Sequence, residues 1–168
     1  NDVRKFGFIK LYELNQITNI SHLNNLGPEP FEKKWNFKYF KDYIANRKRN
    51  IKNILMDQKF VSGLGNIYVN EILFLSGVRP SRIVKKLKNF EIEKIIKYSK
   101  IILKGSIKLG GSTIKDFSSE NGKKGVFQQY FKIYGRKDKK CSNTDCNKSV
   151  IKTTISNRAT FFCKRCQK

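Results

Sequence analysis

Four cysteines near the end of the chain are the residues best suited to chemistry. Cys141 and Cys146 form a C-x4-C pair, Cys163 and Cys166 form a C-x2-C pair, and 16 residues separate the two pairs. Two pairs of thiolates on tight turns can close a tetrahedral zinc site. Because all four ligands would be sulfur, no coordination position is left for an activated water. We therefore predict one structural Zn²⁺ held by these cysteines, and catalysis must come from elsewhere.

Two disulfides are the alternative use of four cysteines. The sequence carries no secretory feature, and cytosolic thiols stay reduced, so zinc is favoured. Between the pairs, "SVIKTTISNRATFFC" alternates apolar and polar residues around "SNR". This pattern predicts a β-hairpin with Arg158 at its tip or just beyond it. So short a segment buries little core, and structural zinc contributes roughly 10–16 kcal/mol to the folding of small fingers.

A second stretch, "VSGLGNIYVNEILF" at residues 61–74, places Gly63, Gly65 and Asn66 directly before an apolar run at helical spacing. One interpretation is a tight turn followed by a helix cap, because Gly and Asn serve both purposes. The other is that bare backbone amides at a helix N-terminus approach an anion closely. The stretch alone leaves both interpretations open.

Helical periodicity dominates the middle of the chain. It predicts helices over residues 36–46, 51–58, 66–77 and 91–111, with Gly77 ending the third. Their aromatic and isoleucine side chains predict the core of a small α-bundle. A polar, Gly-rich stretch of roughly 16 residues follows Gly110 and Gly111. It is either a functional flap or a disordered linker, and alternation returns in "VFQQYFKIYGR".

Composition points to a polyanionic partner. The 168 residues suit one or two small domains, and 36 Lys and Arg against 13 Asp and Glu give a net charge of +23. Such an excess favours nucleic acid, with an anionic membrane surface or another acidic partner as alternatives. No apolar stretch reaches the ~18 residues that a membrane span needs.

The first residues of the sequence resemble an internal segment of a longer protein. The chain begins with Asn1, and residues 4–14 alternate like a strand although no partner strand follows within the next 20 residues. We therefore expect a piece of a longer protein.

Several segments together resemble the bacterial formamidopyrimidine-DNA glycosylases, in the order of that family. They are "LGPEP" (26–30), "LMDQKFVSGLGNIYVNEILF" (55–74), "GGSTIKDF" (110–117), "GVFQQYFKIYGR" (125–136) and "RATFFCKRCQK" (158–168). The resemblance covers essentially the whole chain. The Gly-Leu-Gly-Asn turn and the terminal finger are its specific parts, which the family shares with endonuclease VIII enzymes. The family usually has C-x2-C where this chain has C-x4-C.

The resemblance implies a mainly α fold with a small β part. A helix–two-turns–helix bundle would be followed by a zinc-finger β-hairpin and preceded by the last strand of an N-terminal β-sandwich. We accordingly predict that strand at residues 1–14, a linker at 15–35 and a DNA-binding domain at 36–137. The DNA-binding domain would carry a lesion-covering loop at 110–126, and the zinc finger would occupy residues 138–168.

The resemblance also implies three groups of DNA-contacting residues. Phosphate contacts fall on Lys52, Asn66, Tyr134, Lys152 and Arg158. Arg4 and Phe6 match residues that enter the gap left by an everted base. The loop that folds over an oxidised purine corresponds to Ser112, Thr113, Ile114, Lys115, Asp116 and Phe117.

The function implied is DNA repair by a bifunctional DNA glycosylase and abasic-site lyase that excises 8-oxoguanine and formamidopyrimidines. Family enzymes use an N-terminal proline amine and the adjacent glutamate, through a Schiff base. Neither residue is present here, so we expect this chain to hold damaged duplex DNA and to be inactive alone. We expect a monomer in the bacterial cytoplasm, associated with the nucleoid. The alternatives are a stand-alone, non-catalytic zinc-containing DNA-binding module and an RNA-binding zinc protein.

Overall fold

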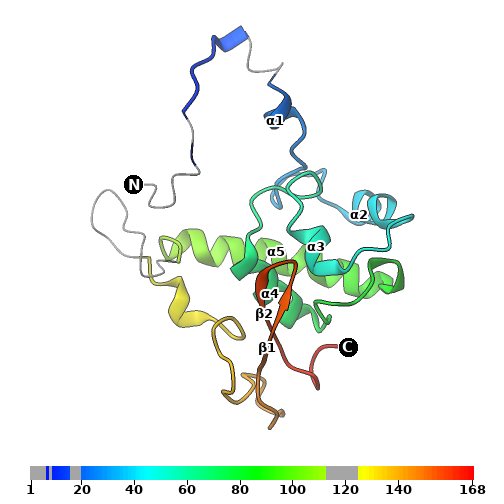
Figure 1. Ribbon diagram of the computed structural model, residues 1–168, viewed down its shortest axis with the longest axis vertical. Helices are drawn as coiled ribbons and strands as arrows, with labels where there is room; N and C mark the ends of the chain where they lie inside the picture. Colours follow the sequence, from blue (N-terminus) through cyan, green and yellow to red (C-terminus); the bar gives the residue numbers. More distant parts are fainter. Residues whose placement is uncertain (1–6, 8, 16–19, 113–124) are drawn as a thin grey trace.

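The computed structural model describes Gly7 and residues 9–15, 20–112 and 125–168. Within them, none of the helices combines the length and the apolar character that crossing a membrane requires. Helix α4 packs against α5 on one side and against strand β2 on another, so the hairpin is mounted on the helical body (Figure 1). The elements are α1 (Ser21–Asn24), α2 (Phe37–Ile44), α3 (Ile51–Leu55), α4 (Asn66–Ser76), α5 (Asn89–Lys108), the 3-10 helices η2 (Val84–Lys86) and η3 (Phe127–Tyr130), and strands β1 (Ile151–Ile155) and β2 (Arg158–Phe162).

The helices begin and end where their sequences indicate. The Asn36 side chain accepts a hydrogen bond of 3.0 Å from Tyr39 N and caps α2, and Asn50 accepts one of 2.9 Å from Asn53 N and caps α3. Gly77 ends α4 in the left-handed region, with φ of 73°. The helical middle predicted from periodicity is therefore confirmed, although each helix ends one to three residues earlier than predicted and α5 begins at Asn89 rather than at residue 91.

Two hydrophobic clusters share helix α4. The larger cluster surrounds Trp35, whose Nε1 donates to Ser99 Oγ at 3.0 Å, and it contains buried residues of α2, α3, α4 and α5. The smaller cluster contains Phe74, Phe161 and three of the cysteines. Leu75 packs against both clusters, so α4 is the element through which the helical body positions the finger.

The "LGPEP" segment packs on the connection between α3 and α4. Gly27 N donates to Gln58 O at 2.8 Å, and Ser62 N donates to Pro28 O at 3.1 Å. A Cβ at Gly27 would lie 2.4 Å from the carbonyl atoms of Phe60, which is too close for any side chain. Only glycine therefore allows this segment to reach the turn that precedes α4.

The hairpin has a two-residue turn, as the "SNR" sequence predicts. Ser156 and Asn157 have φ of 49° and 58°, and Ile155 pairs with Arg158. Two successive residues with positive φ match the twist of the flanking strands. Arg158 is consequently the first residue of β2, directly after the tip.

Two sequence expectations differ from the structure. Gly7 and residues 9–14, the described part of the expected N-terminal strand, form no strand, and Ile9 and Leu11 are fully exposed at 101% and 99%. Within the described residues no strand lies beside this segment to pair with it, and the chain extends away from the helical body (Figure 1). The alternation that begins at Val126 leads into a 3-10 helix, η3, because Phe127 turns into the helical core.

Candidate nucleic-acid interface and metal centre

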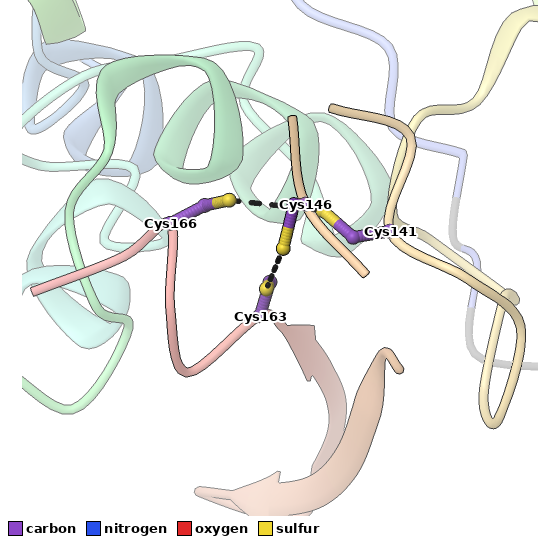
Figure 2. Close-up of side chains that lie close together, drawn as sticks. All are labelled: Cys141, Cys146, Cys163 and Cys166. Carbon is purple, nitrogen blue, oxygen red and sulfur yellow. Dashed lines mark hydrogen bonds between the residues drawn. The ribbon is translucent and has the colours of Figure 1, made fainter. Parts of the chain in front are cut away.

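The four cysteines converge on one point, with their side chains directed toward one another (Figure 2). All four sulfur atoms lie within 4.8 Å of one another. Cys141 Sγ lies 3.8 Å from Cys166 Sγ, and Cys146 Sγ lies 3.6 Å from Cys163 Sγ. A tetrahedron with Zn–S bonds of about 2.3 Å has S–S edges of about 3.8 Å, whereas a disulfide requires about 2.05 Å. The cluster therefore fits a metal ion held by four thiolates, and the C-x4-C spacing does not prevent it.

The wider pair closes through its own turn. Cys146 N donates to Asn143 O at 3.0 Å, which folds the residues between Cys141 and Cys146 back on themselves. The pKa of Cys146 is lowered to about 7, first by a backbone hydrogen bond from Lys148. Burial raises the pKa of Cys141 to about 12. Metal ligation requires thiolates, so binding of a dication at this site is coupled to proton release.

Buried polar side chains of α4 fix the hairpin and the segment that precedes the finger to the helical body. Asn70 Oδ1 accepts from Phe161 N at 2.7 Å, while Asn70 Nδ2 donates to Asn66 O at 2.7 Å. The Glu71 carboxylate accepts the three successive backbone N–H groups of residues 132–134 at 2.8–3.0 Å. Burial is the main effect on the pKa of Glu71 and raises it, although these hydrogen bonds oppose the shift.

The end of the chain is held to the C-terminus of α4. Gln167 accepts from Cys163 N and donates to Val78 O, each at 2.9 Å. Sequence reasoning missed Asn70, Glu71 and Gln167. A signal was available for the first two, because they are the polar pair inside the otherwise apolar run "YVNEILFL". Gln167 belongs to the family segment "RATFFCKRCQK", but the resemblance gave its side chain no role.

Lys52 and Asn66 meet at one carbonyl of the hairpin. Lys52 Nζ donates to Ala159 O at 3.0 Å and to Thr160 Oγ1 at 2.6 Å, and Asn66 Nδ2 donates to the same Ala159 O at 3.1 Å. Ala159 follows Arg158, which is exposed. The turn before α4, the start of α3 and the hairpin tip therefore lie together on one side of the molecule.

Lys52 is an unusual cation because its side chain is fully buried. Its pKa is lowered to about 8, first by burial and then by the positive charge of Arg158. Burial without a counter-charge disfavours the ammonium form, and a nearby anion favours it. The local electrostatics thus suit a negatively charged group between Lys52 and Arg158.

The N-terminus of α4 is open. Gly65 occupies the cap position with no side-chain hydrogen bond, and none of the described residues accepts a hydrogen bond from the N–H groups of residues 66–68. Gly63 has φ of 81°, which accounts for glycine at that position. Gly65 has φ of −102°, and a Cβ there would meet no described atom within 4 Å. Neither backbone geometry nor packing within the described residues requires glycine at position 65.

The other predicted contacts lie on the same part of the molecule or outside the described residues. The ring of Tyr134 packs edge-to-face on Phe161 at 5.0 Å, and Lys152 pairs with Phe161 across the hairpin. Ser112 forms a bridge to Val126, and its buried Oγ has no hydrogen-bond partner among the described residues. The remaining predicted residues, Arg4, Phe6, Thr113, Ile114, Lys115, Asp116 and Phe117, lie outside the described part of the chain.

Comparison with known proteins identifies close relatives. A family model described as the formamidopyrimidine-DNA glycosylase H2TH domain matches residues 26–118. The formamidopyrimidine-DNA glycosylase of Rickettsia felis is 39% identical over 167 residues, which is 99% of this chain and 59% of that protein. The enzyme of the same name from Oceanobacillus iheyensis is 40% identical, with the same coverage.

Solved structures agree with these relatives. The Lactococcus lactis Fpg in complex with DNA containing an abasic site superposes with a TM-score of 0.90 and 34% identity, covering 99% of this chain and 60% of that one. The Thermus thermophilus MutM (Fpg) protein superposes with a TM-score of 0.81 and 32% identity, covering 89% and 56%. The chain thus spans about three-fifths of the length of the relatives that it matches.

Proposed function

Because the chain belongs to the formamidopyrimidine-DNA glycosylase family, we propose that it is the DNA-binding portion of a bifunctional DNA glycosylase and abasic-site lyase. The whole protein would excise oxidised purines such as 8-oxoguanine and formamidopyrimidines, acting as a monomer at the bacterial nucleoid. The proline nucleophile and the adjacent glutamate of the family would belong to a part of the protein that is not in this chain. This chain would hold the damaged duplex for that chemistry.

One observation carries the proposal: Lys52 and Asn66 both donate to Ala159 O, beside the exposed Arg158. This contact places the buried Lys52 cation directly beneath a surface that the open helix N-terminus and the cationic hairpin tip form. Helix N-terminal amides and lysine or arginine side chains are the groups that bind phosphates. We propose that successive phosphates of the lesion strand lie along Lys52, Asn66 and Arg158, with Tyr134 and Lys152 as further contacts.

The remaining site assignments follow from the family. We propose that Arg4 and Phe6 occupy the gap that the everted base leaves, and that the loop from Ser112 to Phe117 covers the base itself. Eversion costs a few kcal/mol, which such insertions help to offset. Zn²⁺ would fit the four-cysteine cluster and hold the hairpin in the position that the phosphate contacts need.

A binding experiment tests the proposal. Duplexes that carry a tetrahydrofuran abasic analogue in different flanking sequences are titrated with the wild-type chain and with Asn66→Ala and Arg158→Ala. Each variant should weaken binding about tenfold, by the same factor for every sequence, because phosphates carry no base information. Lys38→Ala is the control for charge loss, because Lys38 is exposed on α2 and paired with Asp42. A loss that depends on the flanking sequence would contradict the phosphate assignment.

Borohydride trapping distinguishes two hypotheses, that the chain is part of a glycosylase and that it is a stand-alone DNA-binding module. We expect no covalent adduct between this chain and abasic DNA, and an adduct when the upstream coding sequence of the same gene is included. A longer product that binds damaged DNA but forms no adduct would support the module instead. Preference for a structured RNA over damaged duplex would support the RNA-binding alternative.

A further inference from the structure

The two edges of the zinc-finger hairpin differ in how their backbone groups are used. In an antiparallel pair, alternate residues direct their N–H and C=O away from the partner strand. The turn pairs Ile155 with Arg158, so the outward-facing residues are Ala159 and Phe161 on β2, and Lys152 and Thr154 on β1.

On β2 these outward groups are satisfied by the helical body. Ala159 O accepts from Lys52 and Asn66, and Phe161 N donates to Asn70. On β1, no described residue bonds to the backbone N–H or C=O of Lys152 or Thr154. An edge strand with free backbone groups is a template for a further strand.

A groove runs along this open edge. It has a volume of about 450 Å³ and lies between β1 and residues 79–81. Half-buried Ile151, Ile155 and Phe162 contribute an apolar lining. A second hollow of about 480 Å³, lined by Lys148, Ser149, Lys164 and Arg165, shares Ile151 with the first and so continues it along the finger.

The groove is rimmed by positive charge. Both hollows lack any acidic lining residue, and their cations form no ion pair within the described residues. A nucleic-acid backbone would use these charges but not the apolar lining or the free strand edge. An extended peptide uses all three, because its backbone pairs with the edge while alternate side chains enter the lining. The cations are Arg79, Lys148, Lys152, Lys164 and Arg165.

We propose that the outer edge of β1 docks an extended segment of a partner protein in which acidic and apolar residues alternate. The segment adds to the hairpin as a third strand. Its main chain pairs with the outward groups of Lys152 and Thr154, its apolar side chains lie on Ile151 and Phe162, and its carboxylates face the cationic rim. The outward backbone groups of Lys152 and Thr154 point away from Ala159 on the paired strand, so strand addition does not need the contacts at Ala159. The Lys152 side chain is also one of the proposed phosphate contacts, so a bound peptide and bound DNA would share it.

Fluorescence anisotropy of a labelled decapeptide of alternating Glu and Val, titrated with the full zinc-loaded chain, tests the proposal. Thr154→Pro removes the outward N–H but no hydrogen bond to β2, because the N–H of Thr154 points away from β2. Proline is tolerated at such positions on an edge strand. We expect this variant to bind the peptide at least tenfold more weakly and to bind abasic DNA within twofold of the wild type. The same peptide with every backbone amide N-methylated keeps its charge but has no N–H on either edge to donate to β1, and it should bind at least tenfold more weakly.

Hydrogen exchange is a second test of strand addition, and it needs no variant of the chain. The amides of Lys152 and Thr154 should exchange more slowly when the alternating peptide is bound. Equal binding of the N-methylated peptide, or unchanged exchange at these two amides, overturns strand addition. Binding of a ten-residue thymidine oligonucleotide that is lost in Thr154→Pro would overturn the peptide in favour of nucleic acid.

Discussion

At the scale of single residues, the structure gives separate reasons for the two glycines before α4. Gly63 has φ of 81°, a backbone conformation that side chains disfavour. Gly65 has neither that conformation nor a close neighbour among the described atoms. We propose that the lack of a side chain at Gly65 lets the DNA backbone approach the N-terminus of α4.

Gly65→Ala and Gly63→Ala should consequently behave in opposite ways. Alanine at position 65 should cost about 1 kcal/mol of stability or less, which is the usual difference between caps, but should weaken binding to abasic DNA more than tenfold. Alanine at position 63 should lower stability by about 1 kcal/mol through its left-handed backbone. Thermal melts and DNA titrations of both variants make the comparison. Wild-type affinity in Gly65→Ala would mean that no backbone approaches there.

Lys52 predicts a pH dependence of DNA binding. Its pKa of about 8 in the free chain would rise next to a phosphate, so the bound state holds a proton that the free state loses above pH 8. Affinity for abasic DNA should therefore fall as pH increases, by about tenfold between pH 7.5 and 9.5, at constant salt. Lys52→Gln should bind more weakly at pH 7.5 and lack this decrease. A parallel decrease in Lys52→Gln would assign the proton to another group.

At the scale of elements, periodicity and caps were sufficient to predict most of the fold. Helix α4 combines an apolar run with Gly77 as a stop, and the hairpin has alternating strands with a turn sequence that accepts positive φ. The N-terminal strand could not be predicted in the same way. Strand formation depends on a partner strand, and an alternating pattern carries no information about whether one is present.

The sequence likewise predicts one part of the candidate site and not the other. The cysteine cluster follows from spacing, because ligand type and separation determine whether four sulfurs can meet. The attachment of the hairpin to α4 does not follow from spacing. Asn70 and Glu71 reach segments 91 and 61–63 residues away, and the sequence shows only that two polar residues stand in an apolar helix. The family resemblance, rather than periodicity, placed Lys52 and Arg158 at one surface.

Removal of zinc should separate the two hydrophobic clusters. The finger cluster includes three of the cysteines, whereas the helical cluster surrounds the single tryptophan, Trp35. A strong chelator should therefore unfold residues 138–168 and weaken DNA binding at least tenfold, while Trp35 fluorescence stays near its native value. Hydrogen exchange and fluorescence on one sample measure both effects. Full DNA affinity after loss of zinc would contradict a positioning role for the finger.

At the scale of the whole molecule, acidic residues are few and are used locally. The chain has 13 acidic residues against 36 Lys and Arg. Within the described residues the ion pairs involve Asp42, Asp57, Glu91 and Asp138, and Glu71 is occupied by backbone N–H groups. Most cations therefore have no acidic partner in the described part of the chain. The molecule therefore attracts polyanions in general. The proposed phosphate contacts at Lys52, Asn66 and Arg158, where α3, α4 and the hairpin meet, would add to this attraction.

Salt dependence distinguishes this general attraction from individual phosphate contacts. Each neutralised phosphate changes the slope of log K against log salt by about −0.9, so Lys52, Lys152 and Arg158 together should contribute a slope of roughly −3. Arg158→Ala should weaken binding and reduce the slope by about 0.9, because it removes a cation. Asn66→Ala should weaken binding with the slope unchanged, because its neutral amide releases no counterion. Titrations between 50 and roughly 200 mM salt resolve such differences. A change of slope in Asn66→Ala would show that Asn66 is not a neutral phosphate contact. An unchanged slope in Arg158→Ala would show that the Arg158 side chain neutralises no phosphate.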